Sequence, residues 1–552
     1  IEKAFNFHTQ GNISEAAKYY QYFINQGFND HRVLANYGLI LKSLGKVKEA
    51  EKLTRRAIEF KADFAEAYSN LGNILRDQGK LNEAEKCTLK AIKIKPNFAN
   101  AYSNLGNILR DQGKLDEAVN LYRESISLKP DFAQVHFNLG NILRDMGKLD
   151  EAEKSIRKAI KIKPNFANAY SNLGNILLDL GKLEEAEILQ RKAIKLKPDF
   201  AQAYSNLGNI LRDQGKLDEA EMSIAKAIKL KPNLTIAFFN LSYIQLLKGD
   251  YESGLLNYEY RNKVSNINCY PSIEEYDNSQ ISKGDNLLVI SEQGLGDTLQ
   301  QMRYIPYLRK LGLNISFCAQ EKLHSLIKIS GIDPNPLTPD QASEVSEGQW
   351  IPLLSLLRYL KVSPSNPIIS QPYIFTTDKL IKKWKNILKQ EKRPIIGINW
   401  QGNPQSENGS QKGRSLPLEM FSTIANNKNI KIASLQKGFG SEQLEKCSFK
   451  NKFVICQSKI DSTWDFLENA AIIVNCDLII TSDTSIAHLA GGIGKPTWLL
   501  LKNVPEWRWG TNSDKSFWYP SMKLFRQSER YNWNEVMERV SIELQKEFGD
   551  GI

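Results

Sequence analysis

An asparagine recurs every 34 residues along the first half of the chain, from Asn36 to Asn240. Glycine recurs with the same period from Gly45 to Gly249, and proline from Pro96 to Pro232. Between these markers the copies read almost alike, as AYSNLGNILRDQGKLDEA. A repeat of this length predicts units of one supersecondary structure that bury their apolar faces only by stacking on each other. Nearly half of the chain is therefore predicted to form a solenoid.

Each unit is predicted to be a pair of helices. Leu71 and Leu75 lie one turn apart on the apolar side of a first helix, and Gly79 ends that helix. A second helix begins at Leu81 and stops before Pro96, because proline has no N–H to continue it. This unit resembles the tetratricopeptide repeat, and stacked copies are expected to wind into a superhelix with a long concave surface.

The repeated asparagines form a ladder along that surface if their position faces the groove. A carboxamide both donates and accepts hydrogen bonds, so it suits the backbone of an extended peptide of any sequence. The ladder resembles that of the O-linked N-acetylglucosamine transferase superhelix, which implies an acceptor protein or peptide as partner. The alternative is that duplication copied a hydrogen bond between neighbouring repeats. The predicted acceptor-binding residues are Asn36, Asn70, Asn104, Asn138, Asn172, Asn206 and Asn240.

Composition limits the other classes of function. The net charge of +11 admits nucleic acid as a partner, but many of the lysines lie in repeated KAIKIKP segments, where a solvated outer face explains them better. Base-stacking aromatic residues are missing from the expected groove positions, so no nucleic acid is predicted. No run of about 18 apolar residues indicates a membrane span. Six cysteines without CxxC spacing, and the lack of a recognisable signal peptide, favour a cytoplasmic protein.

The repeat decays before residue 261, and strand-like apolar runs follow from residue 286. Strands alternating with helices predict parallel, doubly wound sheets, and their spacing predicts two of them. The expected strands are 286–290, 314–319, 395–400, 431–436, 452–457, 478–481 and 497–501. The expected domains are a superhelix (1–261), a connector (262–283), a first Rossmann-like half (284–375), a helical linker (376–393) and a second Rossmann-like half (394–552). A ligand is expected where the carboxyl ends of the two sets of strands face each other.

The first candidate segment follows the strand 286–290. Gly294 and Gly296 permit a tight turn and close backbone approach, and Asp297 is placed either to cap the next helix or to act as a catalytic carboxylate. Glu292 is the second candidate for a catalytic base. The segment lacks the third glycine of a dinucleotide fingerprint, since Leu299 stands there.

A second segment, residues 399–417, carries Lys412 and Arg414 in a loop rich in glycine and serine. Basic side chains in such a loop suit a phosphate, although a solvated surface loop has the same composition. Lys437, at the end of the next expected strand, has both interpretations too. Trp400 is expected either to form a wall of the donor pocket or to pack in the core, and Trp507 and Trp509 share that choice.

The third segment, residues 476–501, is the most specific. A buried strand ends near Asp483, and a helix begins at Thr484 and Ser485, where unpaired N–H groups and the helix dipole favour an anion such as a diphosphate. His488 lies one turn further on and is either directed at the same anion or buried as a structural residue.

Together these segments resemble the family of the bacterial heptosyltransferases, which have the GT-B fold. The third segment is similar to that family's DTxxxHLxxxxGxP signature, here Asp483, Thr484, His488, Leu489, Gly494 and Pro496. Nearly the whole chain resembles bacterial proteins that join tetratricopeptide repeats to such a domain, also in the stretches EQGLGDTLQ, GRS, LQKG and PEWRWG. The chain shares none of the catalytic segments of the O-linked N-acetylglucosamine transferases.

The resemblance implies an inverting, metal-independent glycosyltransferase without a cofactor, which takes a sugar from a nucleotide sugar whose nucleotide the sequence does not identify. The acceptor is expected to be a protein hydroxyl; a glycan or lipopolysaccharide acceptor, and an inert peptide-binding scaffold, are the alternatives. The implied catalytic residues are Asp297, Glu292 and His488. The implied donor-binding residues are Gly294, Gly296, Trp400, Lys412, Arg414, Lys437, Asp483, Thr484 and Ser485.

Overall fold

The computed structural model describes residues 1–264, 271–276, 282–407 and 412–549. By their contacts these residues form two compact units, 1–206 and 207–552. The boundary lies within a repeat helix, well before the predicted limit at residue 261. The last repeats therefore belong to the same compact unit as the α/β part of the chain.

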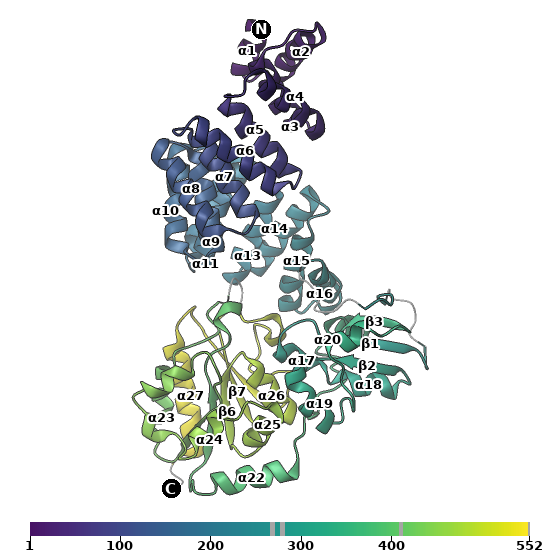
Figure 1. Cartoon of the computed structure of the whole chain (residues 1–552). Helices are drawn as coiled ribbons and strands as arrows, with labels where there is room; N and C mark the ends of the chain where they lie inside the picture. Colours follow the sequence, from purple (N-terminus) through teal and green to yellow (C-terminus); the bar gives the residue numbers. More distant parts are fainter. Residues whose placement is uncertain (265–270, 277–281, 408–411, 550–552) are drawn as a thin grey trace. The chain divides into compact units, whose positions relative to one another are not determined.

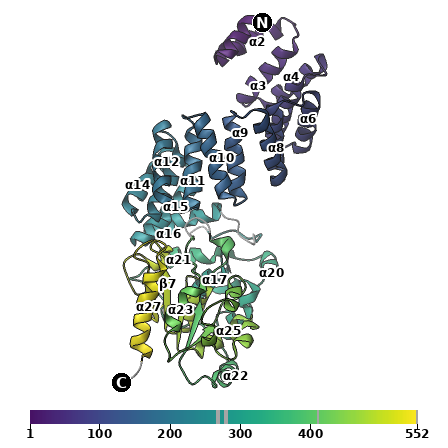
Figure 2. The same ribbon diagram turned by 90° about the vertical axis from the view of Figure 1, so that its left-hand side faces the viewer.

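The repeats are antiparallel helical hairpins, as the sequence predicts (Figure 1). The first helix predicted around Leu71 and Leu75 is α5, and the one predicted from Leu81 is α6. Each of the four hairpins that begin at α3, α5, α7 and α9 packs on the next, as Figure 2 shows for α9 to α12. In the first unit and across the boundary, the helices are α1 Glu2–Thr9, α2 Ile13–Asn25, α3 His31–Ser43, α4 Val47–Phe60, α5 Ala65–Asp77, α6 Leu81–Ile94, α7 Ala99–Asp111, α8 Leu115–Leu128, α9 Ala133–Asp145, α10 Leu149–Ile162, α11 Ala167–Asp179, α12 Leu183–Leu196 and α13 Ala201–Asp213.

The second unit continues with α14 Leu217–Leu230, α15 Thr235–Lys248, α16 Tyr251–Tyr258 and the short helix η1 Glu259–Lys263. Buried Arg261 fastens this end of the repeats to the α/β part: it donates to the Ser355 hydroxyl at 2.7 Å and pairs with Glu292 at 2.8 Å. These contacts explain why the last repeats depart from the repeated sequence.

Two separate parallel sheets follow (Figure 1). The first has the order β2-β1-β3, from β1 Asn286–Ile290, β2 Asn314–Cys318 and β3 Gln349–Pro352. The second has the order β5-β4-β6-β7-β8, from β4 Ile395–Asn399, β5 Lys431–Ser434, β6 Leu478–Ser482, β7 Thr497–Leu501 and β8 Met522–Arg526. Two parallel sheets in tandem agree with the predicted α/β architecture.

Three strands differ from prediction. The strands β3 and β8 were not predicted, and the stretch 452–457 is wrong as a strand because it makes only a single bridge, from Phe453 to Ile432. Its apolar residues are explained by burial without a strand: Phe453 and Val454 are 8% and 2% exposed in the two main cores. The predicted linker helix is present as α22 Asp378–Leu388, and its Trp384 is buried.

Helices cover both sheets. Around the first sheet lie α17 Leu295–Gln301, α18 Tyr304–Lys310, η2 Glu321–Leu323, α19 His324–Ile329, α20 Pro339–Ser343, η3 Leu353–Ser355 and α21 Leu356–Tyr359. The second part contains η4 Pro404–Ser406, η6 Leu418–Phe421, α23 Ser422–Ala425, η7 Ser441–Glu445, η8 Lys450–Lys452, α24 Gln457–Asp461, α25 Phe466–Val474, α26 Ser485–Ile493, η9 Trp507–Trp509 and α27 Trp533–Phe548. Because α17 of the first part packs directly on α26 of the second, the two sheets are held next to one another.

Candidate functional site

A cavity of about 740 Å³ lies between the two α/β parts of the second unit. Its walls follow the carboxyl ends of β1, β4, β5, β6 and β7, which is where parallel sheets present ligand-binding loops. The first part contributes the segment Gln293–Asp297 and Lys322. Of the implied catalytic and donor-binding residues, those that line the cavity are Gly294, Gly296, Asp297, Arg414, Lys437, Asp483, Thr484, Ser485 and His488. Trp509, for which the sequence left pocket wall and core packing open, lines it too.

Buried amides hold three strand ends of this cavity together. The Oε1 of Gln436, after β5, accepts from the Nδ2 of Asn399 at 2.9 Å and from the backbone N–H of Gln401 at 3.0 Å. The Oδ1 of Asn399 in turn accepts from the hydroxyl of Thr484 at 2.8 Å. Thr484 therefore stands at a fixed position, and it is the residue that precedes α26.

The N-terminus of α26 is directed at the cavity. Thr484 and Ser485 line the wall, and the Thr484 side chain makes no capping hydrogen bond to the helix because its hydroxyl is bonded to Asn399. The first-turn N–H groups of such a helix favour an anion. Arg414 and Lys437 line the same cavity, and burial lowers the pKa of Lys437 to about 8. This wall has the chemistry of a phosphate site.

His488 lies at the junction of the two α/β parts. It is 7% exposed, its Nδ1 is 3.0 Å from the Tyr519 hydroxyl, and its ring stacks on Trp509. Burial, together with the cations Arg508 and Arg303, lowers the pKa of His488 far below its usual value. The ring is therefore neutral at physiological pH. It both lines the cavity and packs against Gly296, where an added Cβ would lie 2.9 Å from the ring.

Asp297 caps the next helix, which is one of the two roles that the sequence left open, and it also lines the cavity. One carboxylate oxygen accepts from the Gly294 N–H at 3.0 Å and so caps α17, while the other pairs with Arg508 at 2.6 Å. Arg508 also pairs with Glu506 at 2.7 Å. Burial raises the pKa of Glu506 to about 7. Two carboxylates thus share one buried guanidinium at the edge of the cavity.

Arg508 and Glu506 were not among the predicted site residues. They belong to the PEWRWG stretch directly after β7. The position of this stretch at the carboxyl end of a predicted strand was the available signal. Its charged residues alternate with tryptophans, and the predictions for this stretch concerned only Trp507 and Trp509.

Three predicted site residues do not line the cavity. Glu292 is buried in an ion pair with Arg261 at 2.8 Å and also accepts from the Leu354 N–H, so its position is structural. Trp400 is fully buried in the core beneath the second sheet, which resolves its two interpretations in favour of packing. Lys412 lies at a different cavity.

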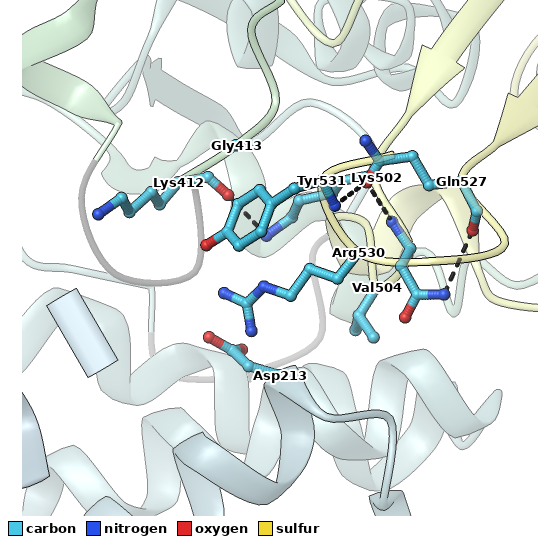
Figure 3. Close-up of a pocket in the computed structure, with 9 residues that line it drawn as sticks. Asp213, Lys412, Gly413, Lys502, Val504, Gln527, Arg530 and Tyr531 are labelled. Carbon is cyan, nitrogen blue, oxygen red and sulfur yellow. Dashed lines mark hydrogen bonds between the residues drawn. The ribbon is translucent and has the colours of Figure 1, made fainter. Parts of the chain in front are cut away.

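That second cavity has a volume of about 10 Å³, room for about one water molecule. Figure 3 shows Lys412, Lys502 and Tyr531 above the guanidinium of Arg530, which faces the carboxylate of Asp213. Asp213 ends α13, so the loops after β7 and β8 meet a repeat helix here through polar side chains. The geometry is that of a polar packing interface rather than of a nucleotide site.

The asparagine ladder makes hydrogen bonds between repeats. The Nδ2 of Asn104 donates to the Ser69 hydroxyl at 2.8 Å, and that of Asn172 to the Oδ1 of Asn141 at 2.8 Å. Asn138 and Asn206 bond to the preceding repeat in the same way, at 3.1 and 3.2 Å. The inter-repeat alternative is therefore present in the structure. Each of these bonds uses one of the two amide hydrogens, so part of the capacity of each carboxamide remains for a ligand.

Comparison with known proteins identifies the repeats. A family model described as TPR repeat matches residues 72–109, 106–143, 140–181 and 174–215, and models of the tetratricopeptide repeat match 31–64 and 201–234. Residues 31–64 and 72–234 therefore consist of tetratricopeptide repeats. The remaining α/β part has parallel sheets, and its family is not identified by these matches.

Among curated proteins, Protein FlbA of Caulobacter vibrioides is 22% identical over 283 residues, which cover 48% of this chain and 46% of FlbA. The chain thus spans about half the length of that relative. Among solved structures, YrrB, described as a TPR protein with an unusual peptide-binding site, is 23% identical over 33% of this chain and 95% of its own, with a TM-score of 0.29. PilF of Pseudomonas aeruginosa is 18% identical over 36% of this chain and 91% of its own, with a TM-score of 0.33. The Cut9-Hcn1 hetero-tetramer is 16% identical over 48% of this chain and 52% of the matched chain, with a TM-score of 0.41.

Within the described ranges, no helix is both long and apolar enough to cross a membrane.

Proposed function

We propose that the α/β part of the chain is a glycosyltransferase that takes a sugar from a nucleotide sugar, and that the tetratricopeptide repeats bind the protein that accepts it. The observation that carries the proposal is the cavity of about 740 Å³ in which the N-terminus of α26, two basic side chains and the Asp297 carboxylate converge. A departing diphosphate needs positive charge and N–H donors, and an attacking hydroxyl needs a base.

In this proposal the diphosphate lies at Thr484 and Ser485, with Arg414 and Lys437 as cations. Asp297 takes the proton as the acceptor O–H bond breaks. The acceptor oxygen bonds to the anomeric carbon, and the bond from that carbon to the diphosphate breaks with its electron pair on the diphosphate. His488, being neutral, can donate a hydrogen bond but brings no charge.

A specific observation favours the second candidate, an inert scaffold. Both carboxylate oxygens of Asp297 are engaged, one by the Gly294 N–H and one by Arg508, so an acceptor hydroxyl would have to compete with these partners. A catalytic Asp297 would have to exchange Arg508 for the acceptor hydroxyl. A scaffold needs no such exchange.

The test is a thermal-shift panel of UDP, GDP, ADP, CDP, TDP and their common sugar conjugates, followed by intact mass of candidate acceptor proteins. The proposal expects stabilisation by one nucleotide class and an added sugar mass. It expects Asp297→Asn to bind the nucleotide but lose transfer, and Asp340→Asn, an exposed acid remote from the cavity, to keep both. Absence of any nucleotide stabilisation would reject the enzyme proposal; binding with undiminished transfer in Asp297→Asn would reject the assigned base.

A further inference from the structure

The loops around the cavity follow the order of the strands. Phe439 comes after β5, the N-terminus of α26 after β6, and Glu506 and Arg508 after β7, while the sheet order is β5-β4-β6-β7. Strands in a sheet lie about 4.8 Å apart, so β5 and β7 are separated by about 14 Å. The carboxylates and Arg508 therefore stand on one side of the cavity, the anion-favouring helix start in the middle, and the loop with Phe439 on the other side.

The side next to β5 is aromatic and open. Trp464 is 66% exposed and Phe439 is 53% exposed, and both line the cavity. The edge of the Trp464 ring lies next to Gly438, since a Cβ added there would be 3.9 Å from its Cη2. Among the ring contacts of the described residues, none joins Trp464 to Phe439. Two large, exposed rings in the lining of one cavity are thus available to a planar ligand, which would remove their apolar surface from water.

A buried acceptor lies beside these rings. Asn469 also lines the cavity and is 5% exposed. Its Nδ2 donates to the carbonyls of Thr463 and Asp465, at 3.2 and 2.8 Å, which fixes which end of the amide is oxygen. Its Oδ1 is buried and has no hydrogen-bond partner in the described part of the chain. A buried acceptor without a hydrogen bond costs free energy, so this oxygen is suited to accept a hydrogen bond from a ligand.

We propose that Trp464, Phe439 and Asn469 form the nucleobase subsite of the cavity, with the base stacked on the exposed rings and one of its N–H groups donated to the Oδ1 of Asn469. The assignment rests on the proposed function, because it takes the ligand to be a nucleotide. It also sets a direction: base next to β5, diphosphate at the start of α26, and transferred sugar beside Asp297.

A flat heteroaromatic ring fits this chemistry better than a second sugar. A base has two π faces for the rings and an N–H on its edge for a single acceptor. A pyranose has several hydroxyls, and this side of the cavity offers one buried oxygen without a partner among the described residues rather than a set of paired donors and acceptors. Every nucleobase carries an N–H. These three residues therefore bind nucleobases as a class and do not select one base over another.

The experiment compares nucleotide and pyrophosphate binding to the full chain by titration calorimetry. The probes are UDP, GDP, ADP, CDP and TDP, with inorganic pyrophosphate as the ligand that has no base. Trp464→Ala is expected to weaken the best diphosphate about tenfold, as loss of one stacked ring does. Trp464→Phe should restore most of the affinity, and pyrophosphate affinity should be unchanged in both. Phe375→Ala, which removes a similarly exposed ring that does not line the cavity, should bind like wild type.

Unchanged nucleoside diphosphate affinity in Trp464→Ala, with wild-type binding present, would overturn the subsite and leave the proposed function standing. An equal loss for pyrophosphate and nucleotide would also overturn it, because the defect would then not concern the base. If no nucleoside diphosphate binds the wild-type chain at all, both the subsite and the proposed function are refuted.

Discussion

The inter-repeat role of the asparagine ladder can be tested with two nearly matched sites. The seven residues 67–73 and 101–107 have the same sequence, AYSNLGN. Asn104 donates to the Ser69 hydroxyl at 2.8 Å. Asn70 makes no side-chain hydrogen bond within the described residues. The repeat before Asn104 has Ser69 as a partner, but the repeat before Asn70 has Ala35 at the same position, and alanine has no hydroxyl. Asn104→Ala therefore removes an inter-repeat bond, and Asn70→Ala does not.

The expected magnitude follows from the partner. Loss of one neutral hydrogen bond costs about 1 kcal/mol net. Ser69 is only 2% exposed, so its hydroxyl, left without this donor, adds up to about 1 kcal/mol more. Asn104→Ala should lower local stability by about 1–2 kcal/mol, and Asn70→Ala by less than about 0.5 kcal/mol. In a solenoid such a loss falls on one interface between repeats.

Native-state hydrogen exchange read by mass spectrometry measures this in the full chain. Amides of α5 and α7 should exchange about 5–30 times faster in Asn104→Ala, the factor that corresponds to 1–2 kcal/mol. Ser69→Ala completes a double-mutant cycle with Asn104→Ala. The variant with both substitutions should lose about 1 kcal/mol less stability than the sum of the losses in the two single variants. Equal acceleration in Asn70→Ala and Asn104→Ala would refute the reasoning, since only one of them has the bond.

Three further outcomes are expected. Glu292→Gln removes the more buried of the two carboxylates that pair with Arg261 and leaves only Glu259, so it should lower the melting temperature by several degrees while nucleotide binding persists; a stable variant without binding would contradict this structural role. Gly296→Ala should weaken packing of α17 on α26 and lower the melting temperature, because its Cβ would lie 2.9 Å from His488; unchanged melting would show that the helices adjust without cost. Anion affinity should fall as pH rises through about 8, where Lys437 loses its charge, and Lys437→Arg should remove that fall; a titration with the same midpoint in both proteins would assign it to another group.

The repeats were predictable because each contact in them is local and recurs. Gly79 and Pro96 bound helices whether or not the rest of the chain is known, and α5 and α6 fall where these residues place them. The strands 286–290 and 497–501 were found for a related reason, since both are continuous apolar runs. The strand β8 was missed because Lys523 interrupts its apolar residues, so that only Leu524 and Phe525 are consecutive and no continuous apolar run stands out.

The site was less predictable, because the burial that gives a residue its role depends on distant contacts. Arg508 meets Asp297 only when the two α/β parts pack together, 211 residues apart in sequence. Asn469 is notable only because two carbonyls fix its amide and leave the oxygen buried. Trp400 and Trp464 are the same residue type, yet Trp400 is fully buried and Trp464 is 66% exposed. Residue type and spacing contain none of this.

The division of the chain after Asn206 has a consequence for how such a protein can change in length. Within the first unit each hairpin packs mainly on the hairpins next to it, so inserting or deleting a whole hairpin there exchanges one interface for another of the same kind. The hairpins after residue 206 have individual partners, such as Ser355 and Glu292 for Arg261, that no copy could replace. Copy number upstream of this point is therefore adjustable without altering the cavity, and we expect natural or engineered variants to differ in the number of early repeats while keeping the last ones.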